Sequence, residues 1–217
     1  MKILITMAWL TTVMMSSAVI TYANASSNNM AHAHIGHVMT KWADTPEQWG
    51  FLPTAIKESE IAAYHAEIAT SNLDDLAFMQ THVKHTLHAL DPSIINEGPG
   101  RGYGVVNAAI NAANHIGASE KSSEATPNIK LHSTHVRASA DNAANWAKEA
   151  VLLSQKILTA SSAVNAAPMV QQLKVITDAL ITGVDANGDG QISWKKGEGG
   201  LGVANIHMEI MMKGEGL

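Results

Sequence analysis

The chain has 217 residues, no cysteine and a formal net charge of −5 at pH 7 with histidine neutral. A chain of this length can bury the core of a single domain. The lack of cysteine excludes c-type haem attachment, iron–sulfur clusters, blue-copper thiolates and thiol nucleophiles. The absence of a basic patch and the small number of Phe and Tyr residues argue against a nucleic-acid-binding surface.

Residues 1–25 predict a secretory signal. Lys2 gives a positive start, residues 3–20 are largely apolar, and Ala23-Asn24-Ala25 has the small-x-small form of a cleavage site. The alternative is an uncleaved membrane anchor, but Thr and Ser residues dilute the apolar run. We therefore expect a periplasmic or secreted mature chain without a stable membrane span, whose net charge falls from −5 to about −6 with the loss of Lys2.

Residues 26–44 form a histidine-containing N-terminal segment. A short polar spacer precedes His32, His34 and His37. These side chains could capture copper or zinc loosely, or they could belong to a polar tail. We interpret His32 as part of a tail and leave both readings open for His34 and His37.

Amphipathic helices dominate residues 45–184, and Thr45 to Gln48 has the pattern of a helix start. In the first long helix Ile61, Tyr64 and Ile68 share one face, which we expect to pack. No period-2 strand pattern competes, so the sequence predicts an all-α, antiparallel bundle of four or five helices. The expected helices cover about residues 53–70, 72–91, 105–116, 126–159 and 167–184, with a short terminal helix at about 201–212.

Residues 185–217 carry a segment rich in oxygen ligands before the terminal helix. Its alternating side chains suit Ca²⁺, a hard ion that takes six to eight oxygens. The segment resembles the first nine positions of an EF-hand calcium loop, although Lys196 stands where that family has a bidentate glutamate. Nearby glycines would let Glu198 fold back and replace it. The expected calcium ligands are Asp185, Asn187, Asp189, Gln191 (through its carbonyl), Ser193 and Glu198.

Histidine spacing points to a second kind of metal site. Residues three apart on a helix lie close enough to share one ion, and neutral imidazole suits Zn, Cu, Fe and Ni. Two inward pairs from facing helices could form a four-ligand site, or two histidines could ligate a b-type haem. His207 is interpreted as an ordinary hydrogen-bonded residue. The candidate ligands are His82, His85 and His88 on one helix, the pair His132 and His135, and the single His65 and His115.

These features together predict an exported metal-binding bundle that serves metal handling or electron transfer, with Ca²⁺ and with Cu, Zn or b-type haem. The alternative is a structural or interaction protein that Ca²⁺ stabilises and that has no transition-metal site. No nucleophile elbow and no HExxH motif is present, so the sequence gives no reason to expect an enzyme.

Overall fold

The computed structural model describes residues 29–217. This part of the chain contains seven α-helices and one short 3-10 turn, joined by loops. The predicted signal, residues 1–25, lies outside this range. The only strand-like pairing within 29–217 is an isolated bridge between Lys41 and Trp49. The elements are α1 (Met30–Met39), η1 (Pro46–Gln48), α2 (Phe51–Thr70), α3 (Leu76–Leu90), α4 (Val105–Lys121), α5 (Pro127–Leu158), α6 (Ala163–Thr182) and α7 (Leu201–Glu215).

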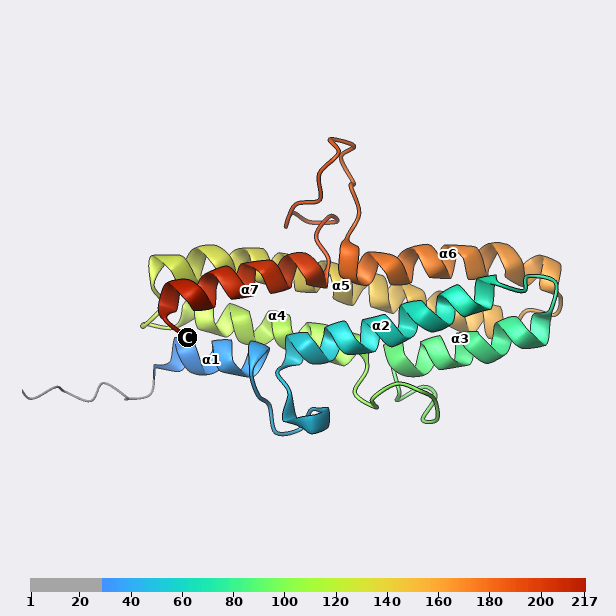
Figure 1. The fold of residues 1–217 in the computed structure, drawn as a ribbon, viewed down its shortest axis with the longest axis horizontal. Coiled ribbons are helices and arrows are strands. Elements are labelled where there is room, and N and C mark those ends of the chain that lie inside the picture. The colour runs from blue at the N-terminus through green and yellow to red at the C-terminus, as the bar shows by residue number, and fades with distance from the viewer. Residues whose placement is uncertain (1–28) are drawn as a thin grey trace, which may run out of the picture.

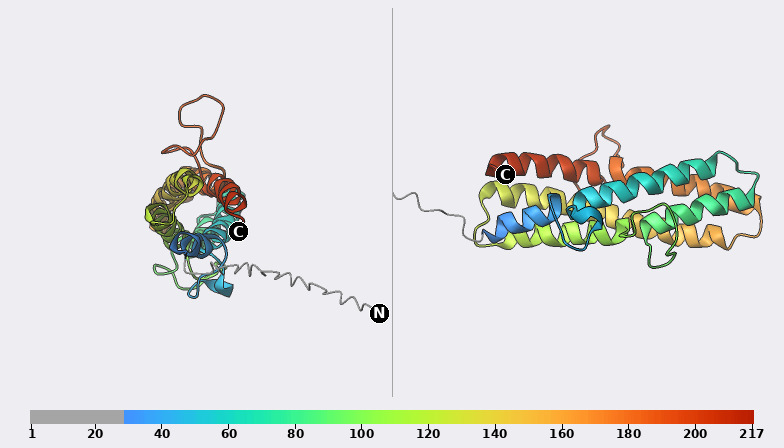
Figure 2. Two further views of the ribbon diagram at one scale, coloured as in Figure 1. Left: turned by 90° about the vertical axis from the view of Figure 1, so that its left-hand side faces the viewer. Right: turned by 60° about the horizontal axis from the view of Figure 1, so that its bottom comes forward.

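The helices form four antiparallel rods (Figure 1). α2 continues the direction of α1, α4 continues that of α3, and α7 continues that of α6, whereas α5 runs the full length alone. Three loops, residues 40–50, 91–104 and 183–200, interrupt the other rods near the middle of the bundle, and they project outward in the end-on view of Figure 2. The predicted all-α antiparallel bundle is confirmed.

Helix boundaries follow local capping chemistry. The Asp75 side chain accepts a hydrogen bond from the Phe78 amide, and Thr126 accepts one from Ile129, as N-cap residues do. The second predicted helix therefore begins after Asp75 and not after Asn72. Thr45 makes no such bond, and the turn at Pro46–Gln48 ends before α2 begins at Phe51.

Two further expectations about helices are corrected. Residues 30–39 form a helix, α1, that the histidine-rich sequence did not predict. On α2, Tyr64 is 64 % exposed, and the buried face consists of small side chains such as Ala62, Ala66 and Ala69. Alanine lets the neighbouring helices α3 and α6 approach closely, so the larger side chains are displaced to the edges of the contact.

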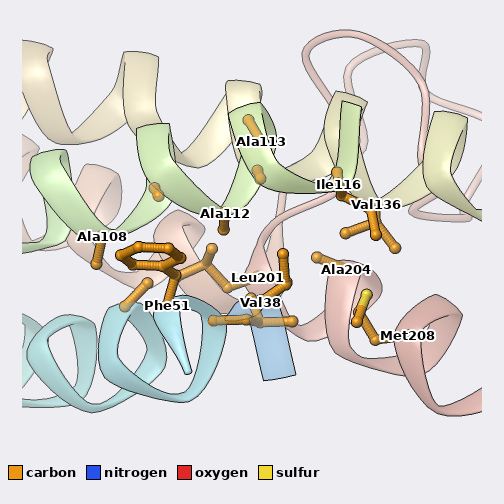
Figure 3. Close-up of a cluster of buried hydrophobic side chains, with 14 of the residues drawn as sticks. Val38, Phe51, Ala108, Ala112, Ala113, Ile116, Val136, Leu201, Ala204 and Met208 are labelled. Atoms are coloured by element: carbon orange, nitrogen blue, oxygen red, sulfur yellow. The ribbon is translucent and has the colours of Figure 1, made fainter. Parts of the chain in front are cut away.

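Two clusters of buried side chains fill the bundle, one in each half. The first draws on α1, α4, α7, the start of α2 and the first half of α5; Figure 3 shows Val38, Phe51, Ile116 and Met208 among its members. The second fills the space between α3, α6 and the remaining parts of α2 and α5. None of the helices within residues 29–217 has the length and apolar character needed to cross a membrane.

Candidate metal centres

Nine of the eleven histidines gather into three triads. Each triad joins two histidines three residues apart on one helix with a single histidine from the antiparallel neighbour. Within each triad the three candidate ligand atoms lie within 4.8 Å of one another, and every member is half-buried. The triads are His34, His37 and His115; His65, His82 and His85; and His132, His135 and His207.

The first triad lies between α1 and α4. The Nδ1 atom of His115 is 3.1 Å from Nδ1 of His34 and 3.2 Å from Nδ1 of His37. Ala31, Ile35 and other buried positions of α1 hold this helix against α4, which sets the ring-to-ring spacing. Residues 30–39, which hold the histidines read as a possible tail (His32 among them), are therefore a helix of the bundle.

The second triad lies between α2 and α3. Nδ1 of His65 is 3.2 Å from Nδ1 of His82, and the His65 ring lies 4.7 Å from the His85 ring, centroid to centroid. Nδ1 of His85 is buried and has no hydrogen-bond partner. A buried ring nitrogen without a partner carries a desolvation cost that a bound ion would remove.

The third triad lies between α5 and α7. Nδ1 of His207 is 3.1 Å from Nδ1 of His132 and 3.4 Å from Nδ1 of His135. His132 and His135 thus face α7 and not the helix that carries His82. The predicted four-ligand site of two facing pairs is not formed, because each pair meets a single histidine of a different helix.

Hydrogen bonds between the three rings of a triad cannot satisfy all of these close nitrogen–nitrogen contacts. A neutral imidazole carries either a proton or a lone pair on Nδ1, and one N–H cannot point at two other nitrogens in line. A central cation can accept the lone pairs of all three rings, each ring keeping its proton on Nε2. Ligands 2.0–2.1 Å from an ion at tetrahedral angles are about 3.3–3.4 Å apart, which is close to the Nδ1 separations of 3.1 to 3.4 Å.

Burial and repulsion between histidines favour the neutral form of six of the nine rings. Burial lowers the pKa of His65 and of His207 to about 4, and repulsion from the other two histidines of each triad adds to the effect. Burial, with repulsion from one or two neighbouring histidines, also lowers the pKa of His37, His85, His115 and His135. Because a metal ligand must be deprotonated, these shifts favour the metal-binding form at neutral pH.

Two histidine assignments from the sequence change. His207, interpreted as an ordinary hydrogen-bonded residue, completes the third triad. His88, predicted to share a site with His82 and His85, lies outside the triads: its Nδ1–H donates to the Ile95 carbonyl at 2.7 Å, and its side chain is buried. The spacing of three identified the pairs on α3 and α5, and His65 and His115 were expected as single ligands, but no sequence signal showed which single histidine joins which pair.

A buried carboxylate anchors the loop that covers His88. Glu58 of α2 is 0 % exposed and accepts hydrogen bonds of 3.0 Å from the backbone amides of Arg101, Tyr103 and Gly104. Gly100 of the same loop lies so close to the His88 ring that a Cβ there would be 2.7 Å from it. Hydrogen bonds join Glu58 to residues 101–104, and the His88 ring packs beneath Gly98 and Gly100 of the same loop; Glu58, His88 and residues 98–104 are here called the Glu58 network.

The oxygen-rich loop has a different geometry from the triads. Glu198 is only 4 % exposed and folds back: its carboxylate accepts hydrogen bonds from the Asn187 side chain, at 2.8 Å, and from the Ser193 amide, at 3.1 Å. Gly197 adopts a φ of +82°, which permits this turn. The Asp185 carboxylate accepts hydrogen bonds from amides of its own loop. Within residues 29–217, Asp185, Asp189 and Glu198 do not form a cluster as tight as the triads.

Comparisons with known protein families, with curated proteins and with solved structures gave no match. The candidate sites therefore rest on the geometry of this chain alone.

Proposed function

We propose that this protein binds up to three transition-metal ions, one in each histidine triad, and serves metal storage or transfer. The observation that carries the proposal is the convergence of three ring nitrogens at three separate places in the bundle. Each place uses the same design, an i, i+3 pair and one histidine from the next helix. The same design recurs between three different helix pairs. A protein that holds several ions would need such repeated sites, whereas an enzyme with one reactive centre would not.

Copper is the metal that the triads favour. All three ligands are neutral, and no carboxylate or thiolate joins them within the described part of the chain. Nitrogen sites bind copper more tightly than the other divalent first-row metals, including zinc. Three neutral imidazoles would also leave only one net positive charge around Cu(I), which limits the cost of burial.

The geometry supports a metal ion better than a b-type haem. Axial haem ligands stand on opposite faces of a flat macrocycle. Ring nitrogens only 3.1 Å apart, as in His34 with His115, leave no space for such a plane between them. The same holds for His132 with His207.

Copper content per chain tests the proposal. The purified protein, loaded with copper and freed of excess ion, should retain three copper ions per chain. His115→Gln, His65→Gln and His207→Gln should each lower that number by one. His32→Gln and His88→Gln are matched controls outside the triads and should leave it at three. Retention of less than one copper by the unaltered protein would contradict the proposal.

We also propose that the 185–198 loop binds calcium. The contacts of Glu198 with Asn187 and Ser193 support it, because they bring this carboxylate next to two of the expected ligands. In this proposal the ion links α6 to α7 and has a structural role. Calcium should raise the melting temperature relative to a chelator, and Asp185→Ala should abolish the increase; equal melting temperatures with calcium and chelator would contradict it.

Export remains part of the proposal on the strength of residues 1–25. A periplasmic or secreted place would suit a cysteine-free protein, since imidazole ligands do not form disulfides as thiolates do. N-terminal sequencing of the protein from its native host should give Ser26 as the first residue; an intact Met1 start would contradict cleavage.

A further inference from the structure

Two of the three triads have a tryptophan from an interrupting loop against them. Trp194, in the 183–200 loop, stacks on His135 of the third triad with ring centroids 4.2 Å apart and an interplanar angle of 19°. Trp42, in the 40–50 loop, lies 4.7 Å from His37 and 5.0 Å from His115 of the first triad. Two loops of unrelated sequence thus place the same side chain against the same kind of site.

The fold holds both tryptophans firmly. Asn142 of α5 lies about two turns beyond His135, and it binds the loop next to Trp194: its Nδ2 donates to the carbonyls of Lys195 and Gly199, and its Oδ1 accepts from the Gly197 amide. The backbone N–H of Trp42 donates to the carbonyls of Gln48 and Trp49, and the indole packs on Phe51. Loop hydrogen bonds and, for Trp42, packing on Phe51 therefore help to fix the position of each indole.

The second triad lacks such a loop residue. Its aromatic neighbours among residues 29–217 come from the same helices as its ligands: Phe78 lies 4.7 Å from His82, and Tyr64 lies 5.2 Å from His65. Tyr64 is 64 % exposed and so excludes little water.

We infer that Trp42 and Trp194 are positioning residues that hold the ligand rings of the first and third triads and slow metal exchange there, so that the second triad exchanges its ion fastest. The inference rests on the proposed metal-binding function. The physical reason is that an indole packed on a ligating imidazole, stacked in the case of Trp194 and edge-on in the case of Trp42, fixes the orientation of that ring and shields the ion from an incoming ligand. One chain would then hold two slowly exchanging ions and one readily transferred ion.

Single-site versions of the full chain test this inference. His65→Gln with His115→Gln leaves the third triad, His65→Gln with His207→Gln leaves the first, and His115→Gln with His207→Gln leaves the second. Each is loaded with Cu(I) without oxygen, and transfer to excess bicinchoninate is timed. We expect transfer from the second triad to be about ten-fold faster than from the other two.

The tryptophan variants identify the cause. In the version that keeps the third triad, Trp194→Ala should raise the transfer rate about ten-fold and Trp194→Phe, which keeps a ring to stack, much less. Trp194→Ala should not change transfer from the second triad. Trp49→Phe is the matched control for a loop tryptophan that lies against Arg101 and no histidine, and it should leave every rate unchanged. Melting temperatures identify any variant that has lost its fold. If Trp194→Ala is such a variant, the transfer rate of Trp194→Phe is compared with that of the parent version instead.

The outcomes separate the two proposals. Three bound copper ions with equal transfer rates, or a Trp194→Ala rate equal to that of the parent version, would overturn the inference and leave the metal-binding function standing. Failure of every version to retain Cu(I) would overturn both.

Discussion

Two neighbouring stretches of the α2–α3 helix pair carry histidine chemistry of opposite kinds, one toward the turn between α2 and α3 and one toward the end next to the 91–104 loop. In the first stretch His65, His82 and His85 converge on a common point with lowered pKa values for His65 and His85. In the second stretch His88, one turn beyond His85, donates Nδ1–H to a carbonyl and lies beneath the loop that Glu58 anchors.

The difference between these stretches is the partner that each ring meets. The Nδ1 of His88 is committed as a donor, because Ile95 offers a carbonyl oxygen. The Nδ1 of His85 meets other imidazoles and has no hydrogen-bond partner. A histidine three residues from another is thus a candidate ligand only where the neighbouring helix adds a third ring. Substitutions in the two stretches should separate stability from metal binding.

The largest expected effect on stability is at Glu58. Glu58→Ala leaves three buried amide donors without their acceptor and should lower the free energy of unfolding by about 3 kcal/mol, with a fall in melting temperature of about 10 °C. Thermal and urea unfolding of the metal-free protein would measure it. Copper content should stay at three per chain in the folded variant. An unchanged melting temperature would mean that the Glu58 network does not support the fold.

The next effect is at His88. His88→Ala removes the bond to Ile95 and leaves a cavity beneath Gly98 and Gly100, which should cost about 2 kcal/mol. Urea unfolding of the metal-free variant is the measurement. If copper content fell by one while stability were unchanged, His88 would be a ligand and the distinction between the two stretches would be lost.

A separate effect should come from pH. For His65 and His207 the pKa falls from 6.5 to about 4 on folding, so the unfolded chain binds more protons between these values. The metal-free protein should therefore lose stability as pH falls from about 6.5 to about 4, and the loss is complete below that range. Comparison with a His65→Gln, His115→Gln, His207→Gln variant isolates the triads. This variant should show a shallower decline, and an identical decline would assign the pH dependence to other groups.

The smallest effect on stability is expected at His85. His85→Gln removes a half-buried ring whose Nδ1 has no partner, so the metal-free protein should change by no more than about 0.5 kcal/mol. The same variant should lose one copper ion per chain. A large loss of stability with full copper content would reverse the roles assigned to His85 and His88.

The calcium-type loop and the triads differ in what a sequence can reveal about them. The alternation of Asp185, Asn187 and Asp189 is local, and it predicts a calcium site before any fold is known. Glu198 does fold back onto this loop, as the glycines near it allow. The carboxylates nonetheless form no cluster as tight as the triads, so calcium binding remains a prediction for experiment.

By itself the sequence determined six of the seven helices, most of their boundaries and the histidine pairs on α3 and α5, because caps, apolar periodicity and i, i+3 spacing act within a few residues of chain. The tertiary structure decided the rest. It turned residues 30–39 into a helix, paired α1 with α4 and α5 with α7, and thereby selected His115 and His207 as third members. It also assigned His88 to the Glu58 network. The register between two packed helices depends on side chains throughout their interface, and no local pattern contains it.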